Sequence, residues 1–263
     1  MRFAVLTSLL EHSSLIHTFF TAKGICLDKK PYLCIIDLTS KGLYMEVIKT
    51  AIDGVVVISP KVFRDERGYF FESFSQREFD AKVRPVRFVQ DNESMSTYGV
   101  MRGLHFQRMP YTQSKLVRCV KGAVLDVAVD IRKGSPTYGR HVSCLLTGLD
   151  EEGARILEGY NERLKAQGSK PIAQGLQFFV PRGFAHGFAV LSETAVFQYK
   201  CDNFYAPQAE GGISIQDDSL GIEWTIPTGR AILSVKDTQH KCLRDFDSPF
   251  SIGMDLYPEC QLQ

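Results

Sequence analysis

The stretch GVMRGLHFQRMPYTQSKLVRCVKG, residues 99–122, contains the histidine and the lysine that are the first candidates for chemistry in this chain. Many β-barrel enzymes carry a pair of metal-binding histidines two residues apart, but here His105 is followed two residues later by Gln107. His105 is therefore a metal ligand without its partner, a general base, or a packed core residue. The base interpretation is chemically sound because imidazole exchanges protons near neutral pH.

A second stretch, VPRGFAHGF, resembles a metal-binding motif of cupin-type jelly-roll barrels. Such barrels take metal ligands from a first motif with two histidines and a glutamate, and from a second motif with proline, glycine and histidine, here Pro181, Gly183 and His186. The first motif is incomplete, because Gln107 stands in place of a histidine and no glutamate follows in RMPYTQSKL. We therefore expect a barrel that binds no metal and needs no cofactor.

Proton transfer without a metal needs a base, an acid and a group that holds developing negative charge. His105 is the candidate base. Lys115 begins an expected strand ten residues later, where it would point into the same barrel as an electrostatic clamp. Tyr199, in the stretch FQYK, is the candidate acid.

From Met45 onward the sequence is patterned as short strands. Runs rich in β-branched and aromatic residues are separated by glycine, proline, asparagine and aspartate, a pattern typical of an antiparallel sandwich or barrel. These runs are GVVVISPKVF, GYFFESF, VRFVQDNESMS, KLVRCVKGAVLDVAVDI, RHVSCLLTG, LQFFVPRGFAHGFAVL, TAVFQYKC and GISIQ. We expect a mainly β, cupin-type jelly-roll barrel with a few flanking helices.

One segment departs from the strand pattern. Residues 150–170, DEEGARILEGYNERLKAQGSK, are rich in residues that favour helices and place Leu157, Tyr160 and Leu164 on one helical stripe. We therefore expect a helical insertion at 150–172, between two strands of the barrel.

Length and composition allow one β-rich domain with a substantial core, or two small ones, since the chain has 263 residues of which 44% are hydrophobic and 23% charged. We expect one barrel domain over 45–250. A poorly packed extension, 1–44, is expected before it and a C-terminal tail, 251–263, after it.

Charge and cysteine content argue against several classes of partner. The formal net charge is only +1, so we expect no binding of nucleic acid or of an anionic membrane surface. The most apolar stretch, MRFAVLTSLLEHSSLIHTFF, is interrupted by Glu11, His12 and His17, and no cleavage site for export follows it. The seven cysteines form no CxxC pair, which favours reduced thiols and a cytoplasmic location.

Several blocks together resemble the dTDP-4-dehydrorhamnose 3,5-epimerase family of deoxysugar biosynthesis. They are PKVFRDERGYFFESF, QDNES, GVMRGLHFQ, SKLVRCVKGAVLDVAVDIRKGSPTYG, VPRGFAHGFAVLSETAVFQYKCDNFY, ILSVKD and LRDF, in order over about residues 50–245. The resemblance implies a cofactor-independent isomerase. Such an enzyme would epimerise carbons 3 and 5 of dTDP-4-dehydro-6-deoxyglucose and so produce dTDP-4-dehydro-L-rhamnose.

The resemblance also implies roles for single residues. His105 would abstract the protons beside the 4-keto group, and Asp237 of ILSVKD would pair with it and orient it. Lys115 would stabilise the enolate oxygen, and Tyr199 would return a proton on the opposite face. A solvated turn is the rival interpretation for Asp237, which lies in the polar stretch SVKDTQHK.

Substrate contacts and an assembly follow from the same resemblance. The substrate phosphates and thymine would be held by Arg102, Gln90, Asn92, His186 and Tyr205. For His186, core packing is an equally good interpretation. The stretch FRDERGYFFE would reach into the site of a neighbouring subunit in a homodimer, with the contacts supplied by Phe63, Arg67, Phe70 and Glu72.

The chain also departs from the family pattern, and other functions stay open. The family usually turns within a few residues where this chain inserts some two dozen between LTG and LQFFVP, and residues 1–44 have no counterpart. One alternative is a nucleotide-sugar epimerase of different regiochemistry, which would use the same residues. Another is a non-catalytic sugar-nucleotide-binding protein on the same barrel. A metal-dependent cupin dioxygenase is disfavoured by Gln107.

Overall fold

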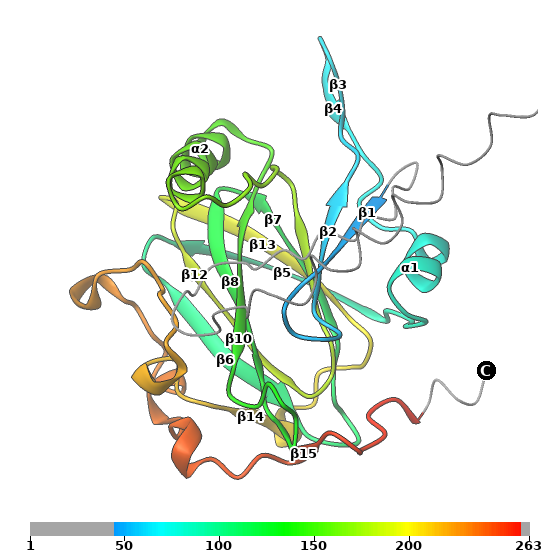
Figure 1. Ribbon diagram of the computed structural model, residues 1–263, viewed down its shortest axis with the longest axis vertical. Coiled ribbons are helices and arrows are strands. Elements are labelled where there is room, and N and C mark those ends of the chain that lie inside the picture. The colour runs from blue at the N-terminus through cyan, green and yellow to red at the C-terminus, as the bar shows by residue number, and fades with distance from the viewer. Residues whose placement is uncertain (1–44, 259–263) are drawn as a thin grey trace, which may run out of the picture. The chain divides into compact units, whose positions relative to one another are not determined.

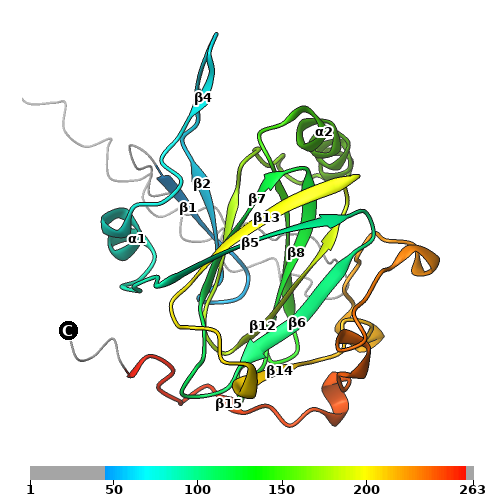
Figure 2. The ribbon, with the colours of Figure 1, turned by 180° about the vertical axis from the view of Figure 1, so that it is seen from behind.

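The computed structural model describes residues 45–258, and its architecture is built on two antiparallel sheets (Figures 1 and 2). The six-stranded sheet runs, in spatial order, through β1 (Met45–Lys49), β2 (Val56–Pro60), β11 (Gln177–Val180), β7 (Lys115–Lys121), β13 (Thr194–Cys201) and β5 (Gln90–Thr97). The five-stranded sheet consists of β10 (His141–Thr147), β8 (Ala123–Asp130), β12 (Phe184–Val190), β6 (Met101–Gln107) and β14 (Glu210–Gly212). The expected cupin-type jelly roll is confirmed.

The main hydrophobic core lies between the two sheets. It joins buried side chains of β7 and β13, such as Val117 and Phe197, to those of β8, β10 and β12, such as Ala128, Leu146 and Phe188. Strand side chains alternate between the two faces of a sheet, so residues two or four positions from these core residues on the same strand also point between the sheets. This alternation is what directs the functional side chains inward.

Within residues 45–258, two α-helices flank the sheets, α1 (Gln76–Lys82) and α2 (Glu151–Ala166). α2 confirms the expected helical insertion. Asp150 caps its first turn, where the carboxylate accepts a hydrogen bond from Gly153 N at 3.1 Å. The predicted stripe of Leu157, Tyr160 and Leu164 is buried and forms part of the main core.

The segment that follows β14 crosses the outer face of the five-stranded sheet. Its apolar side chains, such as Ile213, Ile215 and Phe250, form a second core with Leu104 and Phe106 of β6. The segment contains the 3₁₀ helices η2 (Asp218–Leu220), η3 (Thr228–Arg230), η4 (Asp237–Gln239) and η5 (Leu243–Asp245), and the strand β15 (Phe250–Ser251), which pairs with β9 (Arg132–Lys133). A further 3₁₀ helix, η1 (Pro207–Ala209), precedes β14. This route brings η4 close to β6.

The ends of the chain are described only in part. The expected extension, 1–44, and residues 259–263 of the expected tail lie outside the described residues. Within the tail, Tyr257 is packed: its hydroxyl is 2.7 Å from Ser114 Oγ and accepts a hydrogen bond from Arg182 N at 2.9 Å. Over residues 45–258, none of the helices has the length and apolarity that crossing a membrane requires.

A short hairpin, β3 (Phe63–Asp65) with β4 (Gly68–Phe70), projects away from the sheets (Figures 1 and 2). Every residue of its two strands is exposed. The side chains include large hydrophobic ones, with Phe70 70% and Tyr69 51% exposed. A hairpin of this kind buries too little surface to be stabilised by its own contacts.

Candidate active site

A cavity of about 260 Å³ opens between the two sheets, at the ends of the strands that carry the predicted catalytic side chains. Its lining residues are Gln90, Asn92, His105, Phe106, Gln107, Gln113, Lys115, Tyr199, Cys201, Tyr205 and Glu210. Lys115 lies two and four positions before the core residues Val117 and Cys119 on β7, and Tyr199 lies two positions after the core residue Phe197 on β13, so each is on the same face of its strand as those core residues. Strand alternation therefore turns both side chains into the same space.

His105 and Asp237 form a hydrogen bond of 2.6 Å between Nε2 and Oδ1. Asp237 begins η4 and its side chain is only 4% exposed, whereas the His105 side chain is 25% exposed and lines the cavity. Since Asp237 is buried, the solvated-turn interpretation is wrong. We assign the shared proton to His105 Nε2, because a carboxylate only accepts, which leaves Nδ1 as the basic nitrogen.

The Asp237 carboxylate is held in its charged form. Burial by itself would raise the pKa of Asp237, but hydrogen bonds from His105 and Ser234 and the attraction of His105 lower it below its usual value. A charged carboxylate here stabilises the imidazolium that forms when His105 accepts a proton.

Tyr199 and Lys115 lie on neighbouring strands of the six-stranded sheet. The Lys115 Nζ atom is 5.8 Å from the centroid of the Tyr199 ring. Burial raises the pKa of Tyr199 above its ordinary value, although the charge of Arg102 opposes the shift. The phenol is therefore protonated at neutral pH, and it lines the same cavity as His105.

Polar side chains at the mouth of the cavity form a connected network. Gln90 Nε2 donates to Asn92 Oδ1 at 3.0 Å, and Gln90 Oε1 accepts from Tyr205 N at 3.0 Å. The Tyr205 hydroxyl donates to Glu210 Oε2 at 2.8 Å, and Glu210 is also paired with Lys236. The predicted residues Gln90, Asn92 and Tyr205 are thus brought to the cavity.

Glu210, Gln113 and Cys201 are cavity residues that sequence reasoning missed. The available signal for Glu210 was its place at the start of the short strand in AEGGISIQ. Burial would raise the pKa of Glu210, but hydrogen bonds from Lys236 and Tyr205 lower it. Burial raises the pKa of the Cys201 thiol to about 11, so this thiol is not a nucleophile at neutral pH.

Gln107 has a structural explanation. Its Oε1 accepts from Ala206 N at 2.8 Å, and its Nε2 donates to Tyr111 O at 2.6 Å and to Phe204 O at 3.2 Å. The amide thereby ties two loops to β6. A histidine could not supply this combination of one acceptor and two donors.

Two predicted substrate contacts are not among the residues that line the cavity. His186 is 7% exposed and its Nε2 lies 2.8 Å from the fully buried Asp126 Oδ1, so the core-packing interpretation is the one the structure supports. The imidazole is already hydrogen-bonded to Asp126 inside the barrel, and its contact with substrate stays a prediction. Arg102 is an exposed residue whose guanidinium donates to Ser96 Oγ at 3.1 Å, outside the cavity.

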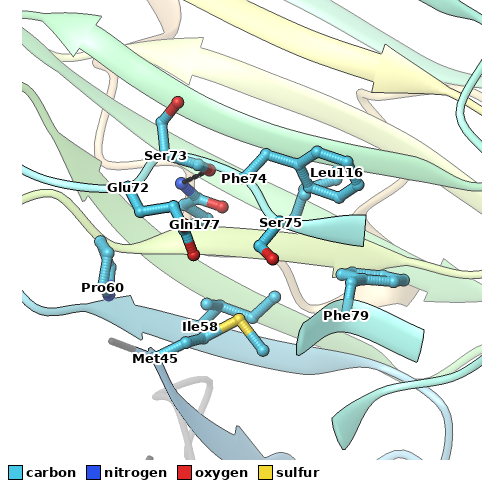
Figure 3. Close-up of a pocket in the computed structure, with 10 residues that line it drawn as sticks. All are labelled: Met45, Ile58, Pro60, Glu72, Ser73, Phe74, Ser75, Phe79, Leu116 and Gln177. Carbon is cyan, nitrogen blue, oxygen red and sulfur yellow. Dashed lines mark hydrogen bonds between the residues drawn. The ribbon is translucent and has the colours of Figure 1, made fainter. Parts of the chain in front are cut away.

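The four residues expected to act on a neighbouring subunit also lie apart from the cavity. Phe63, Arg67 and Phe70 are on the projecting hairpin, where Arg67 is paired with Asp65 at 2.5 Å. Glu72 lines a separate small pocket between β2, β11 and α1 (Figure 3). These four side chains therefore do not complete the site of their own chain.

A second imidazole, which sequence reasoning missed, lies beside His105. The rings of His105 and His240 are 5.7 Å apart, edge to face, with an interplanar angle of 74°. His105, Asp237 and His240 each offer a potential ligand atom, and these atoms lie within 4.8 Å of one another.

Comparison with known proteins adds to this geometry. A sequence model of the family described as dTDP-4-dehydrorhamnose 3,5-epimerase matches residues 49–161 and 172–245. The enzyme of that name from Shigella flexneri is 49% identical over 204 residues, which are 77% of this chain and 98% of the relative. The unmatched interval between the two ranges includes the end of α2.

Solved structures show the same likeness. The crystal structure of dTDP-6-deoxy-D-glucose-3,5-epimerase from Legionella pneumophila, in complex with dTDP-4-keto-L-rhamnose, is 40% identical with a TM-score of 0.68, and the match covers 81% of this chain and all (100%) of that one. A less similar structure is a 3′-monoepimerase from Streptomyces bikiniensis in complex with dTDP-quinovose. It is 29% identical with a TM-score of 0.59, over 74% of this chain and 86% of that one.

Proposed function

Because the chain belongs to the dTDP-4-dehydrorhamnose 3,5-epimerase family, we propose that it epimerises carbons 3 and 5 of dTDP-4-dehydro-6-deoxyglucose to give dTDP-4-dehydro-L-rhamnose. The observation that carries the proposal is the His105–Asp237 pair, which opens on the same cavity as Lys115 and Tyr199. The reaction class, an isomerisation without redox change, needs only proton transfer and charge stabilisation.

His105 removes the proton from the carbon next to the ketone. Such a C–H is acidic only because the resulting charge spreads onto the ketone oxygen. The Lys115 ammonium stabilises that oxygen, and loss of one preorganised group of this kind costs about 3 kcal/mol of activation free energy. Asp237 holds the imidazole in one tautomer and stabilises its charged form.

Epimerisation also requires that the proton return to the other face of the ring. A single base cannot reach both faces, so a second group is needed, and Tyr199 is the proton donor in our proposal. Its raised pKa keeps the phenol protonated between turnovers. Each of the two proton-transfer groups contributes roughly a hundred- to ten-thousandfold in rate.

The nucleotide part of the substrate binds at the polar mouth of the cavity. Gln90, Asn92 and the exposed Tyr205 ring line this mouth, and Tyr205 is held in place by its bond to Glu210. We propose that these residues contact the dTDP group. Arg102, which is exposed on β6, supplies positive charge for the phosphates nearby.

We further propose a homodimer in the cytoplasm. The projecting hairpin exposes Phe63 and Phe70, a surface that favours burial against another protein. In the dimer, Phe63, Arg67, Phe70 and Glu72 would contact the nucleotide in the partner's cavity. The free thiols Cys119, Cys144, Cys201 and Cys242 fit a reducing compartment.

The deciding experiment incubates the protein with dTDP-4-dehydro-6-deoxyglucose in heavy water and follows the sugar by NMR. Deuterium is expected at both carbon 3 and carbon 5, with formation of the L-sugar. His105→Asn should abolish both, and if it left turnover intact the non-catalytic alternative would be favoured. Deuterium at carbon 3 alone would favour an epimerase that acts on one carbon only. The likeness to a 3′-monoepimerase is the reason to test this alternative.

A further inference from the structure

We infer that His105, Asp237 and His240 form a binding site for Zn²⁺, and that the bound ion inhibits the enzyme by occupying its base. Two imidazoles and one carboxylate are common zinc ligands, and together they leave a coordination position open. One donor atom from each residue lies within 4.8 Å of the others. The ion would be an inhibitor and not a cofactor, because zinc on His105 Nε2 leaves the ring proton on Nδ1, and Nδ1 is the nitrogen that must accept the proton from the substrate.

His240 reaches this position because Gly212 has no side chain. Gly212 pairs with His105 across β14 and β6, so a side chain at 212 would lie beside that of His105. A Cβ atom built on Gly212 would come within 2.5 Å of His240 Nε2 and 2.7 Å of its Cδ2. The imidazole of His240 therefore occupies the space that a side chain on β14 would take, next to His105.

The Nε2 atom of His240 is buried and, in the part of the chain that the structure describes, has no hydrogen-bond partner. A buried nitrogen without a partner is unfavourable, and most such atoms in proteins are bonded. The unpartnered nitrogen and the closeness of the three side chains both indicate a binding site for a ligand. A metal ion would satisfy the lone pair of this nitrogen.

The ion would bind between His105 Nε2 and Asp237 Oδ1, in place of the proton that these two atoms share. Two ligands of one tetrahedral zinc ion lie about 3.3 Å apart, given bond lengths near 2.0–2.1 Å. The 2.6 Å separation between His105 Nε2 and Asp237 Oδ1 must therefore increase by some tenths of an ångström. Zinc on Nε2 requires the tautomer of neutral His105 that is protonated on Nδ1, so the ring proton moves from Nε2 to Nδ1.

The charges around the site also bear on binding. Asp237 is the charged ligand, and Glu210 adds a second carboxylate on the cavity side, where it is paired with Lys236. Lys115 lines the same cavity and opposes a cation. We therefore expect zinc to bind through its ligand bonds and not through long-range attraction.

The test uses the full chain, purified without a metal-binding tag, and two binding measurements that need no turnover. Isothermal titration with Zn²⁺ should show one site per chain that is absent from His240→Gln, and Co²⁺ should develop the visible absorption of a four- or five-coordinate site. Zinc should inhibit turnover, and a chelator should restore it. His240→Gln should keep its turnover without zinc and need at least about tenfold more zinc for inhibition.

Controls separate this proposal from the proposed function, on which only the inhibition rests. Cys242→Ser removes a thiol two residues away and should keep the wild-type response to zinc. His240→Leu serves as a second variant if the glutamine oxygen itself binds zinc. Equal inhibition of the wild type and both His240 variants would overturn the proposal, as would loss of binding in Cys242→Ser. Zinc binding without epimerase activity would instead contradict the proposed function.

Discussion

Asp237 lies within hydrogen-bond distance of His105, 2.6 Å, although 132 positions separate the two residues in the chain. The contact exists because the segment after β14 crosses the outer face of the five-stranded sheet and places η4 against β6. A buried, charged carboxylate on one side of the imidazole and a cavity on the other is the arrangement that a general base needs.

Asp237→Asn should reduce turnover by about a hundred- to ten-thousandfold with little change in KM, because the amide no longer stabilises the imidazolium. Steady-state kinetics of the purified variant will measure this effect. Asp245→Asn, a change at an exposed carboxylate on η5, is the matched control and should behave as the wild type. A loss smaller than about tenfold in Asp237→Asn would show that the pair is structural.

Tyr199→Phe should separate proton removal from proton return. His105 can still abstract the proton, so deuterium should continue to enter the substrate from heavy water, while formation of the epimerised product should fall by about a hundredfold or more. NMR of the sugar measures both in one sample. If exchange and product formation decreased together, the assignment of Tyr199 as the acid of the second face would be wrong.

The Tyr199 phenol should ionise only at strongly alkaline pH. Burial disfavours the phenolate, so its pKa lies above the ordinary value of about 10 and the acid form persists up to that pH. An ultraviolet difference titration of the wild type against Tyr199→Phe reports this pKa directly. A midpoint below about 10 would mean that the positive charge of Arg102 outweighs burial.

Gly212→Ala should destabilise the fold and reduce turnover, because its Cβ would lie 2.5 Å from His240 Nε2 and would displace that ring from its place beside His105. Overpacking of this kind costs about 1–3 kcal/mol of unfolding free energy. Thermal unfolding and kinetics should both recover in Gly212→Ala with His240→Ala, which makes room for the methyl group. Gly253→Ala, where an added Cβ has nothing within 4 Å and the backbone is not left-handed, is the matched control and should behave as the wild type.

Local patterns predicted most of the fold and the direction of two candidate side chains. Alternation along β7 and β13 is readable in the sequence, and it directs Lys115 and Tyr199 inward from their own strands. The helical stripe of α2 was equally clear, because a period of 3.6 residues differs from that of the strands around it. Glu210 was not predictable in this way, since a three-residue strand has too little pattern.

The fate of His186 shows the limit of motif reasoning. In the structure it lies on β12, directly opposite His105 in the register of β12 and β6. Whether its ring faces a ligand or a buried partner depends on Asp126, which comes from β8 and is 60 positions away. No local pattern carries that information.

The sequence by itself therefore determined the strands, the inserted helix and the residue types of the reaction, because these follow from short-range periodicity and from the chemistry of single side chains. The family resemblance implied the pair of Asp237 and His105. Only the tertiary structure decided that His240 lies beside that pair, that His186 turns to Asp126, and that the hairpin with Phe63 and Phe70 points away from its own cavity. These contacts depend on the path the chain takes across the outer face of a sheet, and that path is set by the packing of residues that are far apart in the sequence.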